Sequence, residues 1–182
     1  MHEIREILGI HGGIKLSQFD NDLLYEEKCY EQIVKPYLHD RGLDSVFVRF
    51  DSDNIIHSEI QKKYDIDLIT DDQQKNYTLS IKSRRKIYSD IFYETVKNTN
   101  TGEPGWGFYT KADYIFYVMI ENGEYDIVIF DPKKVQSMYL EGYVKRYGKT
   151  FGNKGEVLYK TEGRIIPIKD LPGHRQLKGL VS

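Results

Sequence analysis

The stretch YDIDLITDDQQKNYTLSIKSRRKIYSDIFYE, residues 64–94, decides the fold of this chain. Its segments 64–70 and 77–82 alternate apolar and polar side chains, which is the pattern of strands with one buried face. The six polar residues 71–76 between them predict a turn, so the two segments form a hairpin. A third strand-like segment follows at residues 90–96. We therefore expect three strands within this stretch.

The predicted hairpin brings charged side chains together. Asp65 and Asp67 lie on one face of the first strand, and Asp67 sits further inside the apolar run. Ser80 and Lys82 are two residues apart, so they share a face of the second strand. A carboxylate and an ammonium at one edge of a sheet each favour the other's charged form. The third segment is expected to add Glu94 to the same edge.

The order of an aspartate, a hairpin and an x-Ile-Lys strand resembles the PD-(D/E)XK nuclease superfamily. The likeness spans roughly residues 20–120 and includes a glutamate-bearing helix before the first strand. The GEPGWG loop at residues 102–107 and the KADY segment at residues 111–114 are similar to phage and restriction-associated members. The resemblance implies an α/β fold in a single domain over residues 1–182, with a restriction-endonuclease-like mixed central sheet flanked by helices. It also implies an endonuclease that uses a divalent metal.

The chain departs from the family's motif at Ser80, because Glu or Asp usually stands two residues before the lysine. A hydroxyl is a poor ligand for a hard cation. Some restriction endonucleases of the superfamily have a similar Ser-x-Lys and recruit a glutamate about a dozen residues downstream. Glu94 lies twelve residues after Lys82, which fits that arrangement. If Glu94 does not reach Asp67, the chain is a degenerate nuclease fold instead.

The resemblance assigns a role to each of these residues. Asp67 and Glu94 would hold Mg²⁺ or Mn²⁺, together with the carbonyl of Ile81. Lys82 would orient the attacking water or stabilise the transition state. Ser80 would be at most a hydrogen-bond partner outside the metal ligands.

A helix is predicted over residues 22–38, because apolar residues recur there at three or four positions. Glu27 falls on that stripe. The superfamily often supplies a first-helix glutamate to the metal site, and Glu27 takes that role here. A small rotation of the stripe would promote Glu26 or Glu31 instead. Pro36 and Gly42 mark the helix end.

Two basic clusters are candidates for contact with nucleic acid. Arg84, Arg85 and Lys86 closely follow Lys82 and would clamp phosphates beside the cut, although a solvated charge run has the same sequence. Residues 145–154 mix cations, aromatics and glycine and predict a mobile loop, which either follows a nucleic-acid backbone or is a solvated hairpin tip.

The remaining elements follow from turn signals and periodicity. They are a strand at 45–50, a short helix at 55–63, a hairpin of 114–120 with 125–130, a helix from Pro132 to about 143, and strands near 156–160 and 164–168. We expect Trp106, in the GEPGWG loop, to anchor the following strand in the core rather than to stack on substrate.

Composition sets the outer limits. The chain has 182 residues, of which 40% are hydrophobic, and a formal charge of −2, which excludes a strongly basic nucleic-acid-binding protein. Its one cysteine, Cys29, excludes an internal disulfide or a cysteine zinc site and favours the cytoplasm. The expected partner is DNA and not a membrane, with a homodimer left open. A silent nuclease-like module that binds nucleic acid or protein is the alternative function.

Overall fold

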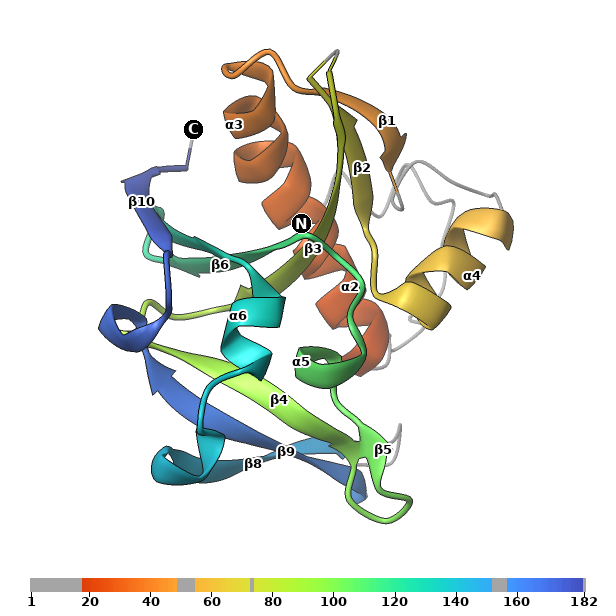
Figure 1. Cartoon of the computed structure of the whole chain (residues 1–182), viewed down its shortest axis with the longest axis vertical. Coiled ribbons are helices and arrows are strands. Elements are labelled where there is room, and N and C mark those ends of the chain that lie inside the picture. The colour runs from red at the N-terminus through yellow and green to blue at the C-terminus, as the bar shows by residue number, and fades with distance from the viewer. Residues whose placement is uncertain (1–17, 49–54, 73, 152–156, 182) are drawn as a thin grey trace, which may run out of the picture.

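The hairpin predicted from residues 64–82 lies in the middle of a six-stranded sheet (Figure 1). The computed structural model describes residues 18–48, 55–72, 74–151 and 157–181. β2 (Leu68–Asp71) pairs antiparallel with β3 (Asn76–Arg84). The turn between them closes on Asp72, whose Oδ1 accepts hydrogen bonds from the backbone N–H groups of Gln74 and Lys75. The predicted hairpin is confirmed, but its first strand begins at Leu68, because Tyr64 still belongs to the preceding helix.

The six-stranded sheet has the order β1-β2-β3-β6-β7-β10. β3 pairs in parallel with β6 (Tyr114–Glu121), and the other neighbours, including β7 (Glu124–Phe130), are antiparallel. Asn122 and Gly123 both have positive φ, at 53° and 82°, which gives the tight reversal predicted between β6 and β7. β1 spans Asp44–Val48, and residues 49–50 of that predicted strand lie outside the described residues. The edge strand β10 (Arg175–Leu180) was not predicted.

A second sheet has four strands in the order β5-β4-β9-β8 and lies at the bottom of Figure 1. Its strands are β4 (Asp90–Asn98), β5 (Glu103–Pro104), β8 (Val144–Phe151) and β9 (Val157–Pro167). The prediction that residues 90–96 join the edge of the hairpin's sheet is therefore wrong. Parallel strands need a crossover connection, and β4 lies within the crossover from β3 to β6. The mobile loop predicted at residues 145–154 is wrong for residues 145–151, which belong to β8 and pair with β9 in a hairpin, and residues 152–154 lie outside the described residues.

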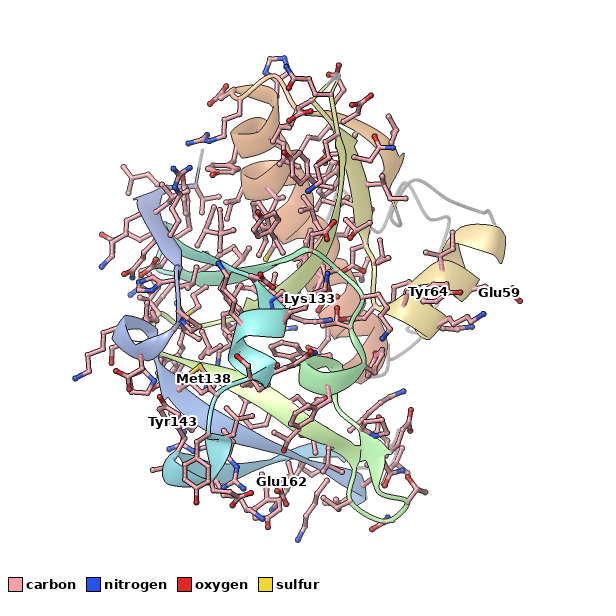
Figure 2. The ribbon with its side chains drawn as sticks, viewed as in Figure 1. Glu59, Tyr64, Lys133, Met138, Tyr143 and Glu162 are labelled. Carbon is pink, nitrogen blue, oxygen red and sulfur yellow. The ribbon has the colours of Figure 1, made fainter. Side chains whose placement is uncertain are left out.

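The two sheets enclose one of two hydrophobic cores. Ile91 and Tyr93 of β4 point into it, together with Ile115 and Tyr117 of β6. Further members are Met119, Val128, Phe130, Val135 and Ile166. Met138 and Tyr143, labelled in Figure 2, are partly buried against this core. This packing fixes which face of β4 remains outside, namely the one that carries Phe92 and Glu94.

A long helical run covers the other face of the six-stranded sheet. α2 (Gln18–Cys29) leads into a π-helical segment (Tyr30–Val34) and then α3 (Lys35–His39), which ends in a Schellman motif with Gly42 at φ 65°. Pro36 is the second residue of α3, just after the π-helical segment, where a missing backbone N–H is tolerated. Cys29, Tyr30, Ile33, Val34 and Leu38 pack against the sheet. The buried stripe is rotated from the predicted one, so that Glu27 is exposed and Glu26 is half-buried.

The remaining helices are short. α4 (Ile55–Tyr64) precedes β2, and Figure 2 shows Glu59 on it pointing away from the sheets. α5 (Trp106–Tyr109) follows the second sheet's β5, and α6 (Pro132–Gln136) begins at the predicted Asp131 cap but ends before residue 143, ahead of a 3₁₀ turn (Leu140–Gly142). A second 3₁₀ turn is Ile168–Asp170. None of the described helices has the length and apolar character to cross a bilayer. The α/β class and the mixed sheet are confirmed.

Candidate functional site

Two buried aspartates lie where α4 turns into β2. Asp65 and Asp67 are each 1% exposed. Asp65 has φ 54°, a left-handed conformation that aspartate tolerates better than most residues, and its N–H donates to the Gln61 carbonyl. The Asp67 N–H donates to the Leu79 carbonyl, so Asp67 is held on β3 although β2 begins only at Leu68.

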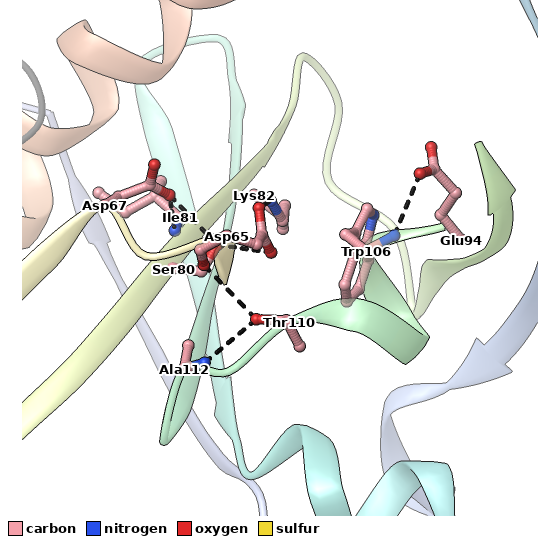
Figure 3. Close-up of polar contacts among 9 residues, drawn as sticks. All are labelled: Asp65, Asp67, Ser80, Ile81, Lys82, Glu94, Trp106, Thr110 and Ala112. Atoms are coloured by element: carbon pink, nitrogen blue, oxygen red, sulfur yellow. Dashed lines mark hydrogen bonds and ion pairs between the residues drawn. The ribbon is translucent and has the colours of Figure 1, made fainter. Parts of the chain in front are cut away.

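Ser80 on β3 contacts both aspartates (Figure 3). Its Oγ lies 3.1 Å from Asp65 Oδ2 and 3.2 Å from Asp67 Oδ2. A hydroxyl has one proton, so it donates to one carboxylate at a time. The Ile81 N–H donates to Asp67 Oδ2 at 2.7 Å. Ile81 therefore contacts Asp67 through its N–H, whereas the sequence reading proposed its carbonyl as a metal ligand.

Lys82 joins this acidic cluster to the protein surface. Its Nζ donates to Asp65 Oδ1 at 2.6 Å and lies 5.5 Å from the centre of the Trp106 ring. Burial disfavours the ammonium, but the Asp65 carboxylate, with Asp67 and Glu26, raises the pKa of Lys82 above its usual value. Burial also raises the pKa of Asp65, an effect that Lys82 opposes. Lys82 is therefore a fixed cation at neutral pH.

Glu94 reaches the same region from the second sheet. Its Oε1 accepts a hydrogen bond from the Trp106 N–H at 3.3 Å, and burial raises its pKa. Figure 3 shows Glu94 on the far side of Trp106 from Asp67. Tyr109, at the end of α5, interacts electrostatically with the acids on both sides, and burial raises its pKa to about 12.

A cleft of about 610 Å³ separates β3 from the outer face of the second sheet. Charged and aromatic side chains line it: Glu26, Lys82, Arg84, Phe92, Glu94, Trp106, Tyr117, Arg146 and Tyr147. Asp65 and Asp67 are not among the lining residues, because they lie beneath Lys82. The helix supplies Glu26 to the cleft and not Glu27, which is exposed.

One wall of the cleft contains a glycine between two charged residues. Gly163 of β9 stands opposite Glu94 of β4 on one side and Arg146 of β8 on the other. A Cβ atom at position 163 would lie 2.6 Å from the Phe92 ring and 2.8 Å from the Tyr93 carbonyl oxygen. The Phe92 ring therefore packs over Gly163, between Glu94 and Arg146, and lines the cleft there.

The glycines of the GEPGWG loop have a packing function. A Cβ at Gly105 would lie 2.6 Å from the Glu94 carbonyl oxygen, so only glycine allows this approach to β4. The close contact sets Trp106 against Tyr93, with ring centroids 5.0 Å apart. Trp106 is 8% exposed, which agrees with the expected core anchor, but its ring also lines the cleft.

The predicted basic cluster splits into different environments. Arg84 lines the cleft, pairs with Asp90 at 3.0 Å and lies over the Tyr88 ring. Arg85 pairs with Asp22 at 2.8 Å outside it, and Lys86 is exposed and does not line it. Arg146, from the second predicted cluster, is the other arginine of the cleft.

The acids do not converge as a metal site would require. Among the residues that the structure describes, no group of three or more His, Cys, Asp or Glu side chains is placed to hold a metal ion. The chemistry of the donors nevertheless suits a hard divalent cation, because four carboxylates, those of Asp65, Asp67, Glu26 and Glu94, surround the single ammonium of Lys82. The charge of these carboxylates suits a divalent metal ion, but their positions in this structure do not.

Comparisons with protein-family models, with curated proteins and with solved structures return no match. The site therefore stands on its own geometry. Sequence reasoning predicted that Ser80, Lys82 and Asp67 lie close together. It preferred Asp67 to Asp65 and therefore did not predict the ion pair between Asp65 and Lys82. It missed Gly163 and the cleft position of Arg146, because both depend on the pairing of strands far apart in the chain.

Proposed function

We propose that this protein hydrolyses phosphodiester bonds of DNA in the cleft, with Mg²⁺ or Mn²⁺, on a restriction-endonuclease-like fold. The observation that carries the proposal is Lys82. Its ammonium is held charged by a buried acidic cluster, and 15% of its side chain is exposed, at a cleft that also holds Arg84 and Arg146. A cation fixed in this way can stabilise negative charge that grows on a phosphate in the transition state.

Different residues of the cleft have different roles in the proposed reaction. Arg84 and Arg146 suit the backbone phosphates on either side of the cut, since guanidinium groups pair well with phosphate oxygens. Tyr147 is 53% exposed and offers a ring to a base or sugar. Lys82 contacts the phosphate that reacts. Asp67, Glu94 and Glu26 are the carboxylates that would hold the metal if they came closer together than they lie in this structure, and the metal would then supply Lewis-acid activation of water and phosphate.

A second candidate is favoured by a specific observation. Asp65 is engaged by Lys82, and Glu94 lies across Trp106 from Asp67, so the acids are not gathered around one point. A module that binds nucleic acid without cutting it fits that arrangement. We propose the cytoplasm as the location for either candidate, because the single cysteine suits a reducing compartment. A homodimer stays a prediction, which sedimentation velocity tests.

The test compares cleavage with binding. Supercoiled plasmid and labelled oligonucleotides are incubated with Mg²⁺, Mn²⁺ or EDTA, and binding is followed by fluorescence anisotropy in EDTA. The nuclease proposal expects cleavage that EDTA stops and that Lys82→Ala reduces by about a hundredfold or more. Lys35→Ala, which removes an exposed lysine that pairs with Glu31 outside the cleft, is the matched control. Binding without cleavage under every divalent metal favours the silent module.

A further inference from the structure

A second cleft lies at the other end of the six-stranded sheet and shares no lining residue with the first. Its volume is about 520 Å³, within the range of roughly 300–1,000 Å³ that is usual for small-molecule sites. α3 and the turn after it contribute to the lining, and most of the other lining residues come from β2, β3, β6, β7, α6 with its Asp131 cap, and the start of β10. Nothing in the proposed hydrolysis uses this cleft.

Aromatic rings form its walls. Tyr37 packs edge-on against Phe116 with centroids 5.7 Å apart. Tyr77 and Tyr114 lie 6.3 Å apart and are tilted by 45°. Tyr114 is 39% exposed, so part of its ring is open to a ligand. Leu38, which is buried, also lines the cleft. Such walls suit a planar aromatic group, which stacks on tyrosine whatever its substituents.

Three cations stand among the lining residues. The Arg41 guanidinium lies 3.6 Å from the centre of the Tyr37 ring and donates to the Tyr37 carbonyl oxygen, so its position is fixed. Lys134 and Arg175 are exposed, and within the described ranges neither forms an ion pair. One of these lining cations is held in place by Tyr37 and the other two form no ion pair with any described residue, so the lining favours an anionic ligand group such as phosphate.

The two acids of the cleft are already engaged by local structure. Asp72 accepts hydrogen bonds from two backbone N–H groups of its own turn and from the Tyr77 hydroxyl. Asp131 caps α6 through the Lys133 N–H. With three cations against two carboxylates, the lining carries a net positive charge although the whole chain is at −2.

Thr70 supplies an independent observation. It lines the cleft from β2 and is 0% exposed, and its Oγ1 has no hydrogen-bond partner among the described residues. A buried hydroxyl without a partner costs free energy, which a polar ligand atom or a bound water recovers. The cleft thus combines aromatic walls, a cationic rim and an unsatisfied polar group.

We propose that this second cleft binds one nucleotide, with its base stacked on the exposed Tyr114 ring and its phosphate on Arg41, Lys134 and Arg175. A nucleotide base accounts for the aromatic side chains of the cleft, and a phosphate accounts for its three cations. A purely apolar ligand would leave those cations without a function. The nucleotide is either a free mononucleotide or the terminal nucleotide of a strand. The proposal does not depend on hydrolysis in the first cleft.

The experiment is calorimetric titration in EDTA, where hydrolysis cannot interfere. The probes are the common mononucleotides, adenosine, inorganic phosphate, and an oligonucleotide with and without a 5′-phosphate. A mononucleotide should bind saturably and at least about tenfold more tightly than adenosine or phosphate alone, since stacking and charge-assisted bonds act together. Competition by the 5′-phosphorylated oligonucleotide identifies a strand end, and its failure to compete identifies free nucleotide; each supports the shared chemistry.

Variants separate this cleft from the first. Lys134→Ala with Arg175→Ala should reduce nucleotide affinity to that of adenosine, and Tyr114→Ala should weaken nucleotide and adenosine alike. All three side chains are exposed, so circular dichroism is expected to show unchanged folding. Lys97→Ala, at an exposed lysine that lines neither cleft, is the control and should leave binding unchanged. The proposal is overturned if no mononucleotide binds saturably, or if Arg146→Ala abolishes binding while the second-cleft variants retain it.

Discussion

Ser80 places a single hydroxyl between two buried carboxylates. The sequence suggested that Ser80 is dispensable, whereas its contacts with Asp65 and Asp67 give it a structural role. Ser80→Ala should lower the free energy of unfolding by about 1–3 kcal/mol, because buried acceptors lose their donor. Urea denaturation measures this, with Ser83→Ala on the same strand as the control. A Ser80→Ala variant as stable as the wild type would contradict the arrangement.

Glu94 should reduce stability at neutral pH. Burial raises its pKa, so the folded state binds the proton more tightly than the unfolded chain, and the charged carboxylate is destabilising. Glu94→Gln should therefore raise the melting temperature at pH 7 in EDTA, where 1 kcal/mol corresponds to roughly 2–4 °C for a chain of this size. The gain should vanish below the ordinary glutamate pKa of about 4.3.

Thermal melts between pH 4 and pH 8 measure this difference. The amide oxygen of the variant can still accept the Trp106 N–H, so the comparison isolates the charge. Glu103→Gln, at an exposed side chain on β5, is the control and should show no such pH dependence. If Glu94→Gln does not raise the melting temperature at pH 7, a charged carboxylate is not buried at this position.

At this scale the sequence predicted part of the site. The period of two placed Ser80 and Lys82 on one face, and both contact the same carboxylate, that of Asp65. It favoured Asp67 over Asp65 and so missed the residue that pairs with Lys82, because that choice depends on the left-handed backbone at Asp65 and on where β2 begins. Neither feature can be predicted from the alternation of apolar and polar residues.

Among the elements, β4 determines whether the cleft exists. Gly163 lets the Phe92 ring, which lines the cleft, pack between Glu94 and Arg146, and an added Cβ would meet that ring and a backbone carbonyl. Gly163→Ala should destabilise the chain by roughly 1–3 kcal/mol, as overpacking does, and should weaken DNA binding in the cleft. Chemical denaturation and anisotropy measure the two effects. Gly142→Ala, where a Cβ meets nothing closer than 3.9 Å, is the matched control.

Element positions were predicted better than element partners. Local signals correctly indicated the hairpins, the Asp131 cap and the helix end at Gly42. The rotation of the helix stripe, which brings Glu26 and not Glu27 to the cleft, follows the packing of Tyr30 and Val34 within the π-helical segment. The sheet to which β4 belongs is determined by its pairing with β9. The alternation of apolar and polar residues along β4 does not show which strand it pairs with.

For the whole molecule, charge sets how DNA binding responds to salt. The net charge is −2, and the first cleft offers three cations, Lys82, Arg84 and Arg146. If these contact phosphates, a plot of log affinity against log salt concentration should have a slope of about −2 to −3. Arg146→Ala should reduce the magnitude of the slope by about 1. Anisotropy in EDTA measures it, and a slope near zero would exclude phosphate contacts in this cleft.

The pairing of β4 with β9 also determines when the first cleft is completed during synthesis. The chain leaves the ribosome from its N-terminus, and local hairpins close early, whereas pairings between distant segments form late. The β2–β3 hairpin can fold before β9, which spans Val157–Pro167, has been made. A chain released before residue 157 would keep Lys82 beside its aspartates but lack the wall in which Gly163 separates Glu94 from Arg146. On the proposed function, incomplete chains are therefore unable to damage the DNA of the cell that makes them.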